Sequence, residues 1–321
     1  MPLVTTRANA ANIGYLNGSR KLPYKWVMTD LNGDVYTSTS TSFANGSFTT
    51  HTTPFSGVKV PNDIASNGKN LYVVVGDTGG LMTSPDGATW TSRTSSFGST
   101  NINAVAYGND GYWVAVGLSG LVAYSTDGIS WTQISTGISG SVTSVAWGNN
   151  LWIIGNGTGA MRTATTPTGT WTSRTSTLGN ISDIHYYKAQ SIWVAGNDSG
   201  MTGALASSTD GTTWTARSSS FNINAAGSSR FASSGSILVH QAYDGSLSAA
   251  ISTSANGTTY TNRTSASTGL ILWSNITSDD AGFFVANGPQ VSSNGTSWSN
   301  RNGPGGTLNN ICHSSGTPSI R

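Results

Sequence analysis

The chain has 321 residues and a formal net charge of +2, and 9% of its residues are charged. A typical soluble protein carries roughly 25% charged residues, whereas this chain contains no glutamate at all. Its basic residues form no stripe or patch, which argues against nucleic-acid binding. No apolar run reaches the roughly 20 residues of a membrane span, and we expect no membrane insertion. The start lacks the apolar core of a secretion signal, and the single cysteine, Cys312, excludes an internal disulfide.

Short strands and turns account for most of the chain, because Ser, Thr, Asn and Gly dominate it and all four are poor helix formers. Residues 1–22 lie outside any repeat. Residues 24–29, 34–39 and 47–53 then read as three strands that lack a fourth. Residues 60–94 contain a complete four-stranded unit, with an apolar second strand at 71–75 and an Asp-Gly hairpin turn at 86–87.

The same unit recurs at a spacing of about 41 residues, which is typical of propeller blades. Its apolar second strand returns at residues 112–116, 151–154, 192–195, 237–239 and 283–285. Residues 308–313 match the first strand of the unit and no other strand follows them. We therefore predict an all-β fold: a seven-bladed β-propeller of four-stranded antiparallel blades, closed by a C-terminal strand that joins the N-terminal blade. The predicted organisation is a leader at 1–22 and a propeller at 23–321, with a composite blade made of 23–54 and 308–314.

Each unit carries a turn of the form Ser/Thr-x-Asp/Asn-Gly-x-x-aromatic. The clearest copies are residues 84–90, 125–131 and 208–214; weaker copies end at Tyr260 and Trp298, and two shorter ones end at Phe48 and Trp171. This turn resembles the Asp-box of sialidase-like propellers, which implies a folding element distant from any active site. The residue types agree, since Asp or Asn caps its own backbone and Gly supplies positive φ. We therefore interpret Asp86, Asp127 and Asp210 as structural.

An arginine follows the aromatic residue by three positions in five units, at Arg93, Arg174, Arg217, Arg263 and Arg301. Sialidases bind a carboxylate with clustered arginines, but these five occupy one repeat position on the outermost strand. They should point outward around the ring and should not converge. Charges on exposed edge strands prevent edge-to-edge pairing, which suffices to explain them.

Catalytic residues are few in this sequence. Glycoside hydrolysis needs two suitably placed carboxylates, and only Asp63 and Asp183 share a position on a first strand where they could face the central channel. The residue set of the sialidases cannot be placed on this chain. The four histidines, His51, His185, His240 and His313, lack zinc-ligand spacing. We predict no catalytic site, no metal and no cofactor, and we expect a protein that is not an enzyme.

The N-terminal residues 4–15 resemble the short leader of bacteriophage tail-fibre and other virion proteins. In those proteins a Thr-Arg-rich start and a small-residue run ending in Gly-aromatic precede an adhesive or decorative module. The resemblance implies a virion component made in the host cytoplasm and exposed after release. Residues 1–22, with Thr5, Arg7 and Tyr15, would bind other virion proteins.

A ligand site is expected on the face that carries the loops between second and third strands and between blades. That face holds three acidic and three aromatic candidates for binding host surface polysaccharide: Asp77, Phe97, Asp198, Phe221, Tyr243 and Asp244. Three alternatives stay open. The chain could decorate or stabilise a capsid or tail without binding a receptor, it could be a free propeller lectin, or it could be a degenerate sialidase-like hydrolase.

Overall fold

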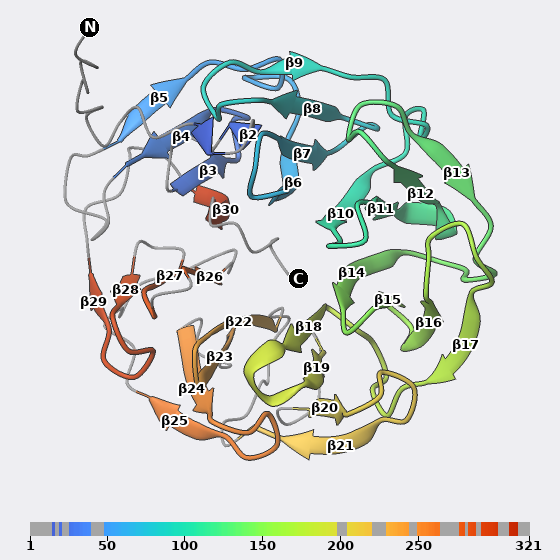
Figure 1. Cartoon of the computed structure of the whole chain (residues 1–321), viewed down its shortest axis with the longest axis vertical. Helices are drawn as coiled ribbons and strands as arrows, with labels where there is room; N and C mark the ends of the chain where they lie inside the picture. The colour runs from blue at the N-terminus through green and yellow to red at the C-terminus, as the bar shows by residue number, and fades with distance from the viewer. Residues whose placement is uncertain are drawn as a thin grey trace, which may run out of the picture.

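Seven four-stranded antiparallel sheets stand in a ring in the computed structural model (Figure 1), which confirms the predicted seven-bladed propeller. The structure describes residues 15–16, 19–20, 26–39, 48–197, 204–219, 229–243, 249–263, 276–279, 282–286, 290–300 and 308–313. The described residues include no helix that is long and apolar enough to cross a bilayer.

The closing blade joins the two ends of the chain, as predicted. Its strands from centre to rim are β30 (Leu308–His313), β3 (Trp26–Asp30), β4 (Val35–Ser38) and β5 (Thr49–His51). Antiparallel pairing places Val27 opposite Cys312 and Met28 opposite Ile311. A C-terminal strand thus supplies the innermost position of a sheet that begins near the N-terminus, and it leaves no open seam in the ring. Outside the blades, β1 (Tyr15–Leu16) pairs with β2 (Ser19–Arg20).

The other six blades are numbered 1 to 6 in chain order, and each runs from centre to rim in sequence order. Blade 1 is β6 (Pro61–Ser66), β7 (Tyr72–Gly76), β8 (Leu81–Ser84) and β9 (Thr91–Ser92); blade 2 is β10 (Ile102–Tyr107), β11 (Trp113–Gly117), β12 (Val122–Ser125) and β13 (Thr132–Ile134); blade 3 is β14 (Val142–Gly148), β15 (Leu151–Asn156), β16 (Ala160–Ala164) and β17 (Thr172–Thr175). Blade 4 is β18 (Asp183–Tyr187), β19 (Ile192–Gly196), β20 (Ala204–Ser208) and β21 (Thr215–Ser218); blade 5 is β22 (Arg230–Ser234), β23 (Ile237–Tyr243), β24 (Ala249–Ser254) and β25 (Thr261–Arg263); blade 6 is β26 (Ile276–Ser278), β27 (Phe284–Ala286), β28 (Gln290–Ser292) and β29 (Ser299–Asn300). Two short 3-10 helices, η2 (Leu118–Gly120) and η3 (Lys188–Gln190), lie in loops of blades 2 and 4.

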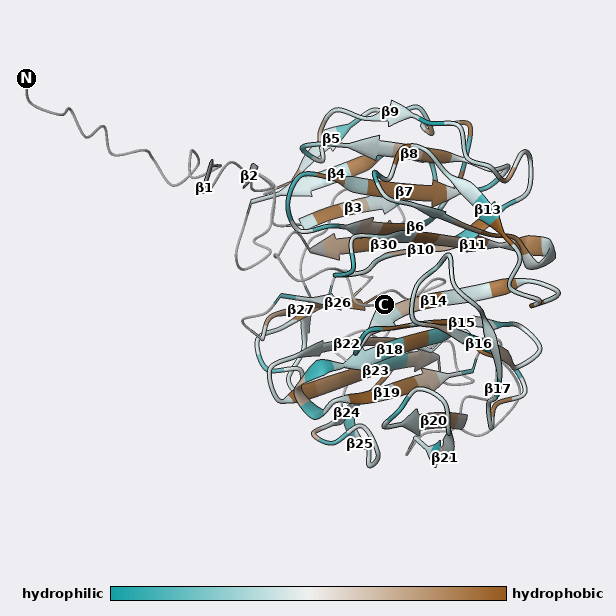
Figure 2. Ribbon diagram, turned by 45° about the vertical axis from the view of Figure 1, so that its right-hand side comes forward, coloured by the Kyte–Doolittle hydropathy of each residue, from teal (hydrophilic) through white to brown (hydrophobic). Residues whose placement is uncertain are grey.

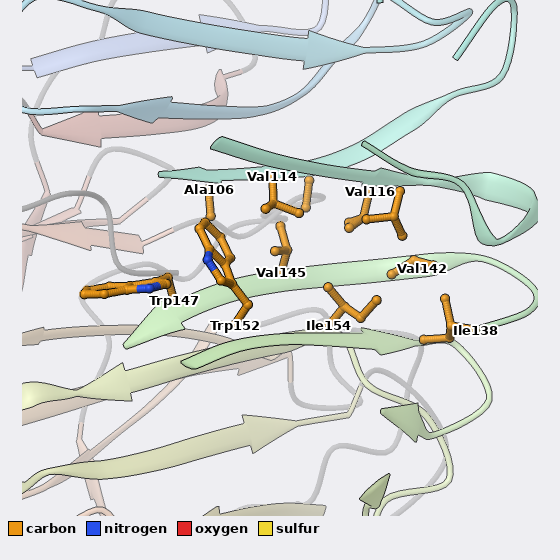
Figure 3. Close-up of a cluster of buried hydrophobic side chains, with 11 residues drawn as sticks. Ala106, Val114, Val116, Ile138, Val142, Val145, Trp147, Trp152 and Ile154 are labelled. Carbon is orange, nitrogen blue, oxygen red and sulfur yellow. The ribbon is translucent and has the colours of Figure 1, made fainter. Parts of the chain in front are cut away.

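The hydrophobic core lies between neighbouring sheets. Second strands such as β7, β11 and β19 are buried along their whole length, because both of their faces meet another blade. Figure 2 shows the hydrophobic colour concentrated on these inner strands. Between blades 2 and 3, Val114 and Val116 pack against Val145 and Ile154 (Figure 3). Each buried aliphatic side chain of this kind contributes roughly 1.5–3 kcal/mol.

The repeated turn folds as its residues predict. In blade 4, Asp210 Oδ1 accepts the backbone N–H groups of Thr212 and Thr213, both at 2.8 Å, and the Gly211 N–H donates to Ser208 Oγ at 2.8 Å. Gly211 has a φ of +71°, and a Cβ there would lie 2.6 Å from Leu151 Cδ2 in blade 3. The turn therefore closes its own hairpin and also packs against the preceding blade.

Candidate functional site

The two innermost carboxylates join neighbouring blades. Asp63 is fully buried; its Oδ1 accepts the N–H of Ile64 at 2.7 Å, and its Oδ2 accepts the N–H of Val105 in blade 2 at 2.9 Å. Asp183 is 7% exposed and accepts the N–H groups of Ile184 and of Phe231 in blade 5, both at 3.0 Å. The prediction that this pair faces the channel is therefore wrong. Both carboxylates are used to hold adjacent first strands together.

Neutral residues of the first strands also make contacts between blades. In blade 3, Ser144 occupies the same strand position, and its hydroxyl accepts the N–H of Ile184 in blade 4 at 3.0 Å. One residue earlier on the first strands, Asn62 Nδ2 donates to Ile102 O at 3.0 Å and Asn103 Nδ2 donates to Val142 O at 2.8 Å. The start of each of these first strands is thus bound to the blade that follows by a short polar side chain.

The predicted loop face carries a polar cluster over blades 1 and 2. Asp77 lies between β7 and β8, is half-buried, and accepts from Asn62 Nδ2 at 3.0 Å. The exposed Thr78 beside it has a φ of +51°; its N–H donates to Asn101 Oδ1 at 2.8 Å, and its carbonyl accepts from Lys59 Nζ at 2.9 Å. Three loops therefore present an acid, an amide and an ammonium group together on a surface held by hydrogen bonds.

The other predicted ligand residues do not join this cluster within the described structure. Phe97 is 3% exposed and packs in the core between blades 1 and 2, so its ring is not presented to a ligand and that prediction is wrong. Its place in a loop between blades suggested exposure, but apolar contacts with the next blade bury it. Tyr243 ends β23, and Tyr15 lies in β1. Asp198, Phe221, Asp244, Thr5 and Arg7 lie outside the described residues.

His240 is a fully buried histidine in blade 5. Its Nε2 lies 3.1 Å from Ser229 Oγ and its Nδ1 lies 3.3 Å from Ser252 Oγ, and its ring stacks on Phe231 at 4.9 Å. Burial disfavours the charged imidazolium and lowers the pKa of His240 to about 3. The ring is therefore a neutral core residue. Within the described ranges, no three His, Cys, Asp or Glu side chains are grouped so that they could hold a metal.

The rim arginines have a partner that sequence reasoning missed. Each of the four that the structure describes reaches inward to a hydroxyl on the third strand of its own blade, and Arg301 lies outside the described residues. The Nε distances are 2.9 Å for Arg93 to Thr83 Oγ1, 2.9 Å for Arg174 to Thr163 Oγ1, 2.8 Å for Arg217 to Ser207 Oγ, and 2.8 Å for Arg263 to Thr253 Oγ1. The signal was present in the sequence, since a Thr or Ser recurs at this third-strand position in the blades that carry these four arginines.

Comparisons with known proteins agree on the fold. No protein family matches the chain, and no curated protein sequence matches it. Among solved structures, YCF48 from Cyanidioschyzon merolae is 18% identical with a TM-score of 0.54, over 75% of this chain and 84% of that one. YCF48 bound to a D1 peptide is 17% identical with a TM-score of 0.57, over 88% and 87%. The computationally designed Ika8 protein is 16% identical with a TM-score of 0.57, over 84% and 80%. At these identities the likeness shows the propeller fold alone.

Proposed function

We propose that this chain is a non-enzymatic binding protein of a bacteriophage virion, displayed on tail or capsid, whose loop face binds a host surface polysaccharide. Residues 1–22 attach it to other virion proteins in this proposal. The leader-like residues 4–15 support the virion assignment, and the low charge of the chain suits a protein exposed to the medium.

The use of Asp63 and Asp183 is the observation that carries the non-enzymatic part of the proposal. A general acid or nucleophile must reach a substrate, whereas each of these carboxylates accepts two backbone N–H groups inside the ring. A binding role needs only a rigid surface with a few positioned polar groups. The cluster of Lys59, Asp77 and Asn101 around Thr78 supplies such groups. YCF48, which shares the fold, is described as bound to a D1 peptide, which supports binding as a use of this architecture.

The test is binding of the fluorescently labelled full-length protein to an array of purified bacterial surface polysaccharides. We expect saturable binding to one polysaccharide, competed by the same polymer in solution. Asp77→Asn keeps the oxygen that accepts from Asn62 but removes the charge, and it should weaken binding. Lys188→Gln, in the η3 loop between the first and second strands of blade 4, is the control and should leave binding unchanged.

Two results would separate the alternatives. If no polysaccharide binds, while the full-length protein re-attaches to virions from which it has been stripped, the chain is a decoration or stabilising protein. If the polymers are shortened on incubation, the chain is a hydrolase and the non-enzymatic proposal is wrong.

A further inference from the structure

The rim arginines that the structure describes use less of the guanidinium than Arg162 does. In Arg174, Arg217 and Arg263 the Nε is bound, and the two Nη groups have no hydrogen-bond or ion-pair partner in the described structure. By contrast, Arg162 donates from Nη1 to Met161 O and Ser173 Oγ, both at 3.1 Å, and from Nη2 to Gly137 O at 2.7 Å. The rim arginines are thus anchored by one nitrogen and leave the outer fork open.

The anchor also orients the fork. Each of the three arginines is half-buried, while the two residues before it on the strand are exposed. The Nε bond and the packed stem reduce the rotamer freedom that a free arginine would lose on binding. An open guanidinium fork matches the two oxygens of a carboxylate, sulfate or phosphate. The positions are therefore preorganised for an anionic group.

The three arginines lie on consecutive blades. Arg174 lies on β17, Arg217 on β21 and Arg263 on β25, and Figure 1 shows these strands following one another around the rim, one in each blade. Among these three blades only blade 4 has an Asp, Asp210, in its repeated turn, because blade 5 carries Asn256 there and the turn of blade 3 has no acidic residue. This arc of the rim therefore carries positive charge with fewer carboxylates in the repeated turns.

Blade 2 breaks the pattern. There Ile134 takes the place of the arginine, since it lies opposite Val122 as Arg217 lies opposite Leu205. Tyr124 takes the place of the Ser or Thr on the third strand. Edge protection accounts for charge on a rim strand, but it does not require that a hydroxyl and an arginine occur together. The two residues occur together in blades 1, 3, 4 and 5, where the hydroxyl positions the guanidinium, whereas the blade that precedes Arg301 carries Val291 at the third-strand position.

We propose that the rim formed by Arg174, Arg217 and Arg263 binds an acidic polysaccharide, with one carboxylate or sulfate group seated on each fork. A single exposed ion pair of this kind contributes little, so one fork alone would bind an acid group only weakly. A polymer that carries an acid group on each repeat engages several forks at once, and the later contacts form at high effective concentration. A spacing of one arginine per blade suits a flexible polymer better than it suits a compact anion.

This surface is separate from the loop face, and its test does not depend on the proposed function. The probes are polygalacturonate, which carries carboxylates, and dextran sulfate, with neutral dextran and duplex DNA as comparisons. Binding to the full-length protein is measured by calorimetry at low and at physiological salt. We expect both acidic polymers to bind, neutral dextran not to bind, and affinity to fall as salt screens the charges.

Three variants separate the effect of the guanidinium forks from that of positive charge in general. The first replaces Arg174, Arg217 and Arg263 with Gln, and it should lose at least about tenfold in affinity, since several linked contacts are removed together. The second replaces the same three with Lys, which keeps the charge but loses the fork and its anchor; it should recover only part of the affinity. The control replaces Lys69 and Lys188 with Gln, which removes two positive charges from loops between first and second strands, and it should stay within about twofold.

Several outcomes would overturn the proposal. If the Gln triple variant binds as the wild type does, the rim is not the site. If the control variant loses as much as the rim variant, or the Lys variant binds fully, general attraction explains the binding and the positioned fork does not. If duplex DNA binds as tightly as the acidic polymers and is equally sensitive to the rim variant, the site is not one for polysaccharide. Cooperative thermal unfolding of every variant well above the assay temperature ensures that a loss of affinity reports on the surface.

Discussion

The inner and outer ends of the blades use polar side chains in opposite ways. At the inner end, Asp63 and Asp183 are buried and each satisfies two backbone N–H groups, one of them in the next blade. At the rim, Arg174 and Arg217 are half-buried and satisfy one hydroxyl of their own blade. A buried polar group must find partners, because leaving it unpaired is costly, whereas a rim group can leave donors to water. The inner end therefore determines stability, and the rim has polar groups to spare for a ligand.

The inner end should be the most sensitive region. Asp63→Ala removes the acceptor of two buried N–H groups and should lower the free energy of unfolding by about 4 kcal/mol. Ser144→Ala removes one neutral acceptor between blades 3 and 4 and should cost about 1.5 kcal/mol. Urea unfolding followed by tryptophan fluorescence gives both values. Equal losses in the two variants would contradict the role assigned to the carboxylate.

Substitutions in the repeated turn should have an intermediate effect on the free energy of unfolding. Gly211→Ala should cost about 2–3 kcal/mol, because Ala is disfavoured at positive φ and its Cβ would meet Leu151 in blade 3. Gly137 has a φ of +68° and open space around the position that a Cβ would take, so Gly137→Ala should cost only about 1 kcal/mol. The difference between the two unfolding free energies measures the contact between turn and blade. If they are the same, the turn does not support the neighbouring blade.

Acid should weaken the inner region through His240. Burial lowers the folded-state pKa of His240 to about 3, below the ordinary 6.5, so the unfolded chain takes up the proton first. The contribution of this group is complete above pH 6.5 and is lost as pH falls toward 3, at about 1.4 kcal/mol per pH unit. Unfolding free energies at about pH 7.5 and about pH 5 should therefore differ by about 2 kcal/mol. The difference should shrink in His240→Gln, and an unchanged difference would assign the effect to other groups.

The rim should tolerate substitution. Arg217→Lys loses the Nε bond to Ser207 and should lower the free energy of unfolding by about 0.5 kcal/mol, because water replaces the lost partner. Urea unfolding measured beside the Asp63 variant tests this directly. A loss of several kcal/mol would mean that the rim arginines hold blades together, and the contrast between the two ends would not stand.

The sequence was a good guide to the sheets and a poor one to the side chains between them. The apolar second strand at residues 71–75 and the turn at 84–90 are local patterns, and both formed as predicted. Asp63 and Phe97 are misjudged because their partners depend on how blades pack: Asp63 accepts the N–H of Val105, a whole repeat away, and Phe97 is buried between blades 1 and 2. The hydroxyl partner of Arg217 was missed although Ser207 is only ten residues earlier. Predicting that contact requires the register between the third and fourth strands, which the repeat spacing alone does not give.

What the sequence determined by itself was the repeat, the number of blades and the closure of the ring by residues 308–313. The repeat and the number of blades follow from alternation, turn chemistry and spacing along the chain, and the closure follows from the first-strand pattern that returns at residues 308–313. The tertiary structure decided which polar groups are consumed and which remain available. Burial and hydrogen-bond partners are properties of neighbouring blades, so Asp63 became a link between strands and Arg217 kept an open fork. In the sequence, Asp63 and Arg217 look equally suited to bind a ligand. In the structure their availability differs, because Asp63 lies between first strands and Arg217 lies at the water-exposed rim.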